Sequence, residues 1–325
     1  MWTVFGSHGR IRFWFRVGLR ANEYSKLSGM QKTLRALFCC WTLLICSSFQ
    51  DPQIRVEVEA VNVLATVTDN KGRFIIDLTE NDFEVREDGV LQEITNFSQP
   101  SDLPLRIALL IDTSASVRLK LDFEKRAATN FLYSVMRPED RALLVEFDTG
   151  ISLLHDFTNR PGAIARAIKG LRAGGGTALV DALYAVSRDK MGGSAARKTV
   201  VIVSDGRDLN SRRTVKEAVE MAHRTGVIIY GIGTTRFGAD QDRKGERMLE
   251  ELAENTGGRV FFPYSAERLS DAFELINEEL RTQYSITFVP TNKAKDSKFR
   301  KIQLKVLNRK KLNVRHRKGY FAPSQ

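Results

Sequence analysis

Cysteine and histidine are scarce in this 325-residue chain, and their scarcity argues against disulfide bonds, thiol catalysis and zinc sites. The only cysteines are Cys39, Cys40 and Cys46, so the later sequence offers neither a disulfide framework nor a thiol nucleophile. The four histidines are scattered and form no HExxH motif or other zinc-binding pattern. The sequence also lacks a Gly-x-Ser-x-Gly elbow and the lysine of a phosphate-binding loop. It therefore carries no familiar motif of a hydrolase, a zinc enzyme or a nucleotide-binding protein.

The net charge of +11 comes from the two ends of the chain. Residues 1–48 contain seven Lys/Arg and one Glu, and residues 293–318 contain twelve Lys/Arg and one Asp. The remaining sequence is therefore net acidic, and we expect no nucleic-acid partner. The basic C-terminal stretch has two interpretations, a surface for polyanions or the solvent-facing side of a β-strand.

An apolar stretch from Leu34 to Ser48 follows the basic residues after Met30, and this order is typical of a signal peptide. We therefore predict that residues 1–48 are an upstream extension plus a signal peptide over Met30–Ser48, and that the mature chain is secreted or periplasmic. One alternative is a retained membrane anchor, although a span usually needs ~20 apolar residues. Another is lipidation of Cys46 after the lipobox-like Leu43–Cys46. Membrane association is expected only through such an uncleaved or lipidated N-terminus.

Two β-rich flanks enclose a different middle region. Residues 49–100 alternate apolar and polar side chains and contain the turn signals Asp69–Gly72 and Glu87–Gly89. Residues 282–325 return to strand patterns after the middle region ends. Neither flank holds enough strands to be stable alone, so we predict that the two pair into one small β-sandwich-like module.

Residues 105–281 alternate strand and helix patterns. This predicts an α/β fold, a doubly wound and mostly parallel Rossmann-like sheet covered by helices on both faces. The runs Leu105–Ile111, Lys198–Val203 and Val227–Gly233 are almost continuously apolar, as expected for strands that are buried on both faces. Helix patterns cover residues 117–136, 163–171, 179–187, 212–224, 248–255 and 266–281.

Three loops of this region carry oxygen donors, and these are Asp112, Ser114, Ser116, Thr177 and Asp205. Two of the loops directly follow buried strands, and the third is the glycine run 174–176 that precedes Thr177. Because ligands bind beyond the carboxyl ends of parallel strands, we expect the three loops to converge. Two carboxylates and three hydroxyls suit Mg²⁺ or Mn²⁺ rather than Zn²⁺. Hydroxyl ligands leave the metal with net positive character, so it can accept a carboxylate from a partner.

The spacing of these residues resembles the metal-ion-dependent adhesion site of the von Willebrand factor A family, over roughly Leu105 to Arg281. All five positions of that motif are filled. The flanks resemble a bacterial "VWFA-related" family, through Phe83–Val90 and Arg315–Phe321. The resemblance implies a von Willebrand factor A fold outside the cytoplasm. It also implies an adhesion module, not an enzyme, that recognises an acidic group on a protein partner.

The same resemblance implies roles for the five site residues. Ser114 and Ser116 bind the metal directly, Thr177 binds directly or through water, and Asp112 and Asp205 act partly through water. Four further residues are weaker candidates for binding. Asp181 adds charge near the metal or is an ordinary helix residue, and Asp148 lines the ligand face or forms a turn. Arg315 and Arg317 are the candidates in the basic tail.

Two other functions stay open from the sequence. One is a metal-dependent hydrolase at the same loops, for which no general base or nucleophile is evident. The other is a polyanion-binding surface protein that acts through the basic C-terminal tail.

Overall fold

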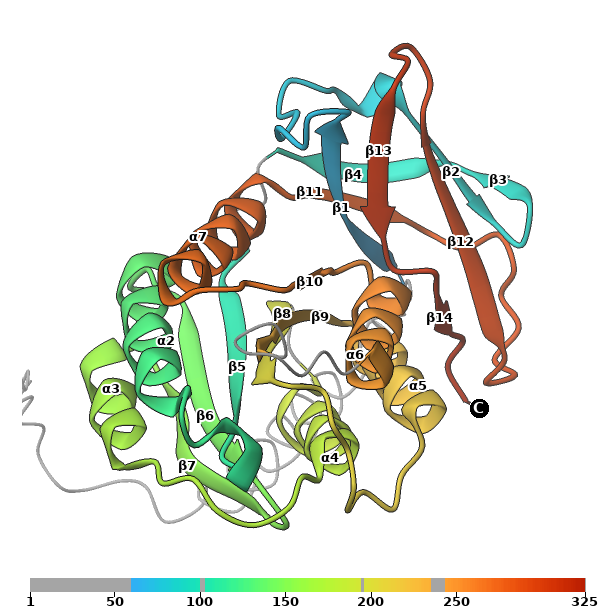
Figure 1. Cartoon of the computed structure of the whole chain (residues 1–325). Helices are drawn as coiled ribbons and strands as arrows, with labels where there is room; N and C mark the ends of the chain where they lie inside the picture. Colours follow the sequence, from blue (N-terminus) through green and yellow to red (C-terminus); the bar gives the residue numbers. More distant parts are fainter. Residues whose placement is uncertain (1–59, 100–102, 194–195, 235–242, 325) are drawn as a thin grey trace, which may run out of the picture. The chain divides into compact units, whose positions relative to one another are not determined.

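The computed structural model describes residues 60–99, 103–193, 196–234 and 243–324 (Figure 1). The predicted signal peptide, its start at Met30 and all three cysteines lie outside these residues. Within the described residues, no helix is long and apolar enough to span a bilayer.

The middle region folds around a six-stranded sheet with the order β10-β9-β8-β5-β6-β7. Its strands are β5 (Leu105–Asp112), β6 (Arg141–Phe147), β7 (Ile151–Thr158), β8 (Arg197–Ser204), β9 (Val227–Gly233) and β10 (Val260–Phe261). Neighbouring strands run parallel, except that β6 and β7 are antiparallel. The mostly parallel sheet predicted from the sequence is confirmed.

Helices cover both faces of this sheet (Figure 1). One face packs against α2 (Leu121–Val135), α3 (Pro161–Gly170) and α7 (Ala266–Thr282), and the other against α4 (Leu179–Lys190), α5 (Val215–Thr225) and α6 (Arg243–Thr256). Alternate residues of each central strand enter different cores. In β5, Leu109 and Ile111 belong to the first core, whereas Ala108 and Leu110 belong to the second. This two-sided burial explains the continuous apolar runs in the sequence.

The two β-rich flanks form a module of two four-stranded antiparallel sheets, β13-β1-β11-β4 and β14-β12-β2-β3. The first flank supplies β1 (Val61–Asp69), β2 (Phe83–Glu87), β3 (Val90–Gln92) and β4 (Ile94–Ser98). The second flank supplies β11 (Tyr284–Phe288), β12 (Phe299–Val306), β13 (Leu312–His316) and β14 (Gly319–Phe321). Strands of the two flanks pair directly, β1 with β11 and β2 with β12, and share one apolar core. The predicted β-sandwich-like module is confirmed.

Local signals and the structure agree at the turns below and differ at several helix starts. The helix predicted from residue 248 begins at Arg243, and the one predicted from residue 212 begins at Val215. Asp88 and Gly89 have φ values of 47° and 87°, as a two-residue hairpin turn requires, and Gly226 ends α5 with φ 71°. The helix predicted from residue 117 begins instead at Leu121. The chain first forms a short 3₁₀ helix, η2 (Ala115–Val117), within the loop between β5 and α2.

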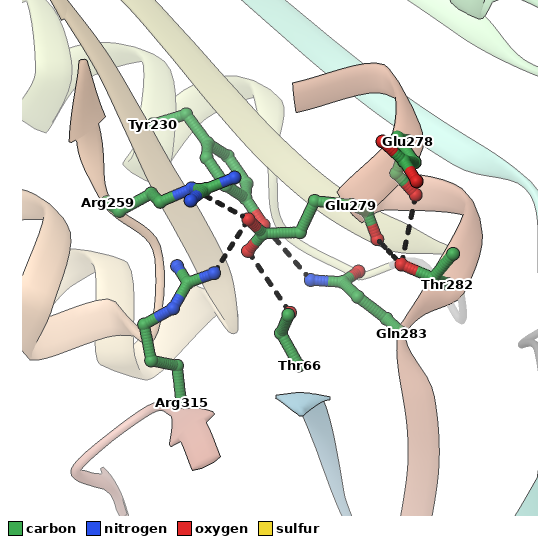
Figure 2. Close-up of polar contacts among 8 residues, drawn as sticks. All are labelled: Thr66, Tyr230, Arg259, Glu278, Glu279, Thr282, Gln283 and Arg315. Carbon is green, nitrogen blue, oxygen red and sulfur yellow. Dashed lines mark hydrogen bonds and ion pairs between the residues drawn. The ribbon is translucent and has the colours of Figure 1, made fainter. Parts of the chain in front are cut away.

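The buried Glu279 of α7 ties the α/β region to the β module (Figure 2). Its carboxylate accepts hydrogen bonds from Tyr230 Oη (2.8 Å) and from Thr66 Oγ1 of β1 (3.1 Å). Arg315 Nη2 of β13 donates at 2.7 Å, and Arg259 Nε lies 3.0 Å away in an ion pair. Five segments that are distant in sequence therefore meet at one carboxylate.

Candidate metal centre

Asp112 ends β5 and is fully buried. Its Oδ1 accepts a hydrogen bond from Ser114 N (2.8 Å), and its Oδ2 accepts one from the Ser204 hydroxyl at the end of β8 (2.6 Å). The register of the two strands, with Ile111 opposite Val203, brings their carboxyl ends side by side. The Asp112 carboxylate is therefore held by the loop that follows it and by the neighbouring strand.

The two serines of the first loop present their hydroxyls to each other. Ser114 Oγ and Ser116 Oγ are 2.9 Å apart, across the short turn η2 that Ser114 caps. Ser114 is buried, whereas Ser116 is exposed. The loop thus offers two adjacent hydroxyl oxygens, one of them on the solvent side.

The glycine run lies directly against this first loop. Gly174 N donates to Thr113 O (2.7 Å), and Ala115 N donates to Gly175 O (3.2 Å). Gly175 has φ +74°, and a Cβ there would lie 2.9 Å from Asp148 Oδ2. Glycine is therefore required at this contact, both for its backbone conformation and for the close approach of Asp148.

Backbone hydrogen bonds also join Thr177 to the loop that follows β8 and carries Asp205, which is the third site loop in chain order. Leu209 N and Asn210 N both donate to Thr177 O, at 3.1 and 2.9 Å. Asn210 Oδ1 in turn accepts from Thr177 N (3.0 Å), and a Cβ on Gly176 would overlap that oxygen at 2.1 Å. The third loop therefore fixes the position of Thr177, which is itself buried.

Two buried carboxylates give the site its electrostatic character. Asp205 is 4% exposed, and its Oδ1 accepts a hydrogen bond from Arg207 N (3.0 Å). Burial raises the pKa of Asp112 to about 6, against the hydrogen bonds from Ser204 and Ser114, and the nearby charge of Asp205 raises it further. A cation between the two aspartates would offset both the desolvation and the repulsion. The donors are all oxygen atoms, so the residues fit a hard divalent cation.

Hydrogen bonds link the three loops that carry the five residues chosen from the sequence, and the weaker candidates have contacts of their own. Asp181 accepts hydrogen bonds from Arg212 N (3.0 Å) and Arg213 N (2.9 Å), so it holds the third loop in place. Asp148 lies beside Gly175 and accepts from Gly150 N (2.8 Å). In the basic tail, Arg315 binds Glu279, and the half-buried Arg317 donates to Asn62 O (2.6 Å). Both arginine side chains are thus engaged within the protein.

Several residues that shape the site were not singled out from the sequence. Ser204 binds Asp112, Asn210 positions Thr177, and Thr149 Oγ1 accepts a hydrogen bond from Gly176 N at 2.7 Å. Ser204 had a signal, because it sits next to Asp205 at a strand end. Asn210 and Thr149 had none, since their partners are distant in sequence and depend on the fold.

The solved structures that are similar to this chain match it at low sequence identity and with TM-scores below 0.5. A von Willebrand factor type A protein from Catenulispora acidiphila is 14% identical, with a TM-score of 0.49, and the match covers 82% of this chain and 74% of that one. The conserved hypothetical protein BatB from Bacteroides thetaiotaomicron is 16% identical, with a TM-score of 0.45 over 55% of this chain and 100% of that one.

Proximal thread matrix protein 1 from the mussel byssus, described with a zinc-occupied MIDAS motif, is 18% identical with a TM-score of 0.48. That match covers 57% of this chain and 47% of the mussel protein.

No curated protein sequence matches the chain. The family model of the von Willebrand factor type A domain, however, matches residues 107–275, which is more than half of the 325 residues. This range contains the six-stranded sheet, apart from the first two residues of β5, and all three loops of the oxygen cluster. The chain therefore belongs to the von Willebrand factor type A domain family.

Proposed function

We propose that the chain is a metal-dependent binding module that recognises a carboxylate on a protein partner, and that it catalyses no reaction. The observation that carries the proposal is the pair of buried aspartates, Asp112 and Asp205, on two loops that backbone hydrogen bonds join to the segment of Thr177. The hydroxyls of Ser114 and Ser116 contact each other, and the histidines of the described residues, His155, His223 and His316, make their contacts elsewhere in the protein. This supports binding over hydrolysis.

Mg²⁺ or Mn²⁺ is the proposed cofactor, because all the donors are hard oxygen atoms. Ser114, Ser116 and Thr177 would hold the ion, with Asp112 and Asp205 supplying the negative charge. When bound, the ion supplies a positive centre for the carboxylate of the partner. The protein keeps its aspartates in place through Ser204 and the backbone of Arg207. The exposed Ser116 marks the side from which a partner can approach.

The rim around this open side supports a partner with acidic and apolar character. Leu119, three residues after Ser116, is 92% exposed, and Leu209, whose amide binds Thr177 O, is 79% exposed. Arg118 and Arg212 next to these loops are exposed as well. Large exposed leucines beside a charged site are typical of interaction surfaces. We therefore propose that the bound carboxylate belongs to a protein segment with apolar neighbours. We also propose that the protein acts outside the cytoplasm, on the signal-peptide pattern of Met30–Ser48.

Calorimetric titration of Mg²⁺ and Mn²⁺ into the full chain tests the metal site. We expect saturable binding in the wild type and its loss in Asp112→Asn, because that substitution removes one of the two buried charges. Asp189→Asn, which removes an exposed carboxylate paired with Arg188, is the matched control and should bind as the wild type does. Equal binding in wild type and Asp112→Asn would overturn the assignment of the site.

Fluorescent peptides with a central Glu flanked by leucines then test the partner chemistry. We expect binding that EDTA abolishes and that a Gln in place of the Glu weakens at least tenfold. Equal binding of the Glu and Gln peptides would contradict a carboxylate ligand, and equal binding of serine-flanked peptides would contradict the apolar rim.

A further inference from the structure

Glu124 differs from the other buried acidic side chains of the described residues. Glu87, Asp112, Asp140, Asp205 and Glu279 are buried too, and each accepts at least one hydrogen bond. Glu124 is 0% exposed, and among the described residues neither of its carboxylate oxygens has a hydrogen-bond partner. A buried carboxylate without a partner is strongly disfavoured in its charged form.

The position of Glu124 places it beside the candidate metal centre. It lies on the first turns of α2, between Leu121 and Ala128 on the face that packs against the sheet. Thr234 follows the carboxyl end of β9, and its buried hydroxyl is also unpartnered in the described residues. The Thr234 hydroxyl is close enough to lower the pKa of Glu124. Glu124 therefore lies at the same edge of the sheet as the oxygen cluster.

The groups that act on Glu124 are Asp112 and Asp205 of the site loops, Thr234 after β9, and Lys120 at the start of α2. Burial is the main cause that raises its pKa, to about 8, and the charges of Asp112 and Asp205 raise it as well. Lys120, one turn earlier on α2, acts in the opposite direction, but its ammonium group donates to Thr234 O instead. Glu124 therefore faces two negative charges and one positive charge that is already engaged.

We propose that Glu124 couples metal binding at the Asp112 cluster to proton release. Without metal the carboxyl is protonated and neutral, in an apolar setting beside two aspartates. A divalent cation at the cluster reverses the local field, so the O–H bond of Glu124 breaks, its proton passes to solvent, and the carboxylate adds to the charge that retains the ion. The inference rests on the proposed metal site, and it adds a third acidic group that lies outside the three loops.

The test is Mg²⁺ titration of the full chain at pH 7.5 in HEPES and in Tris, whose ionisation enthalpies differ. The difference in observed enthalpy gives the number of protons released per ion. With the pKa of Glu124 at about 8, the wild type should release roughly 0.8 proton. Asp112 adds little, because a group with a pKa of about 6 is already ionised at this pH.

In Glu124→Gln, which keeps the shape of the side chain, the release should fall close to zero and the affinity should drop roughly tenfold or more. Asp122→Asn removes an exposed acid on the same helix and should release as many protons as the wild type. As a second readout, the infrared band of a protonated carboxyl should disappear when Mg²⁺ is added to the wild type and be missing from Glu124→Gln.

Saturable Mg²⁺ binding without proton release in the wild type would overturn this inference and leave the proposed function intact. Unchanged proton release in Glu124→Gln would overturn it too. If the wild type shows no Mg²⁺ binding at all, the proposed function, on which this inference depends, is refuted instead.

Discussion

Removing the charge of Glu279 should weaken the protein at the junction between its α/β region and its β module. The carboxylate is fully buried and contacts two guanidinium groups, those of Arg259 and Arg315, as well as the hydroxyls of Tyr230 and Thr66 (Figure 2). Breaking a buried ion pair by removing one partner costs about 3–5 kcal/mol, because the other charge is left uncompensated. In Glu279→Gln two cations lose their counter-charge at once. We therefore expect the free energy of unfolding to fall by about 3–5 kcal/mol.

The expected change is large enough to measure by thermal and urea unfolding. A loss of this size lowers the melting temperature by roughly 10 °C in a protein of this length. Because Thr66 and Arg315 belong to the β module and Tyr230 to the central sheet, unfolding should also become less cooperative and divide into two transitions. Glu278→Gln is the matched control, since Glu278 is the neighbouring residue on α7 and is exposed. A Glu279→Gln variant that unfolds like Glu278→Gln, within about 0.5 kcal/mol, would refute this reasoning.

Two further predictions concern the site and the response to acid. Gly206→Ala should lose most of its Mg²⁺ binding and about 2–3 kcal/mol of stability. Gly206 has φ +77°, and a Cβ there would lie 2.4 Å from Gly245 O. The substitution should therefore displace the loop that carries Asp205. Gly72→Ala, at φ +78° with no atom within 4 Å, is the control and should cost about 1 kcal/mol with metal binding unchanged. Burial lowers the pKa of His223 from an ordinary value of 6.5 to about 4. Between these two pH values the unfolded state therefore binds more protons than the folded state. The free energy of unfolding should then fall as the pH drops from 6.5 to 4. Between pH 7 and pH 4.5 the wild type should lose roughly 2 kcal/mol more than His223→Gln, measured by urea unfolding, and parallel pH profiles would contradict this.

The fold could be predicted largely because its signals are local. Continuous apolar runs such as Leu105–Ile111 mark strands with helices on both faces, and Asp88–Gly89 marks a hairpin. The pairing of the two flanks was predicted from their small number of strands. The strands β13 and β14 were not predicted as such, because five and three residues are too few to show a clear alternating pattern.

The five oxygen donors of the site could be chosen from the sequence, since each follows a strand end or a glycine run. The residues that hold these donors in place could not be identified from the sequence. Asn210 and Ser204 act through partners that only the folded chain brings near. Arg315 and Arg317 show a related limit, because a run of basic residues in the sequence does not reveal which of its side chains have partners within the protein. In the structure one of them compensates Glu279, and the other binds a backbone carbonyl of β1.

The two buried glutamates of α2 and α7 show why burial alone does not define a functional residue. Glu279 has four partners, including two arginines, and its charge is satisfied within the protein. Glu124 has the same burial and, in the part of the chain that the structure describes, no hydrogen-bond partner. In the sequence it breaks the apolar stripe of α2 that Leu121, Ala128 and Phe131 form. An acidic residue on the inner face of a helix costs stability unless something else compensates it. In this protein the compensating charge would be the metal itself, so removing Glu124 should stabilise the metal-free protein while weakening its hold on the ion.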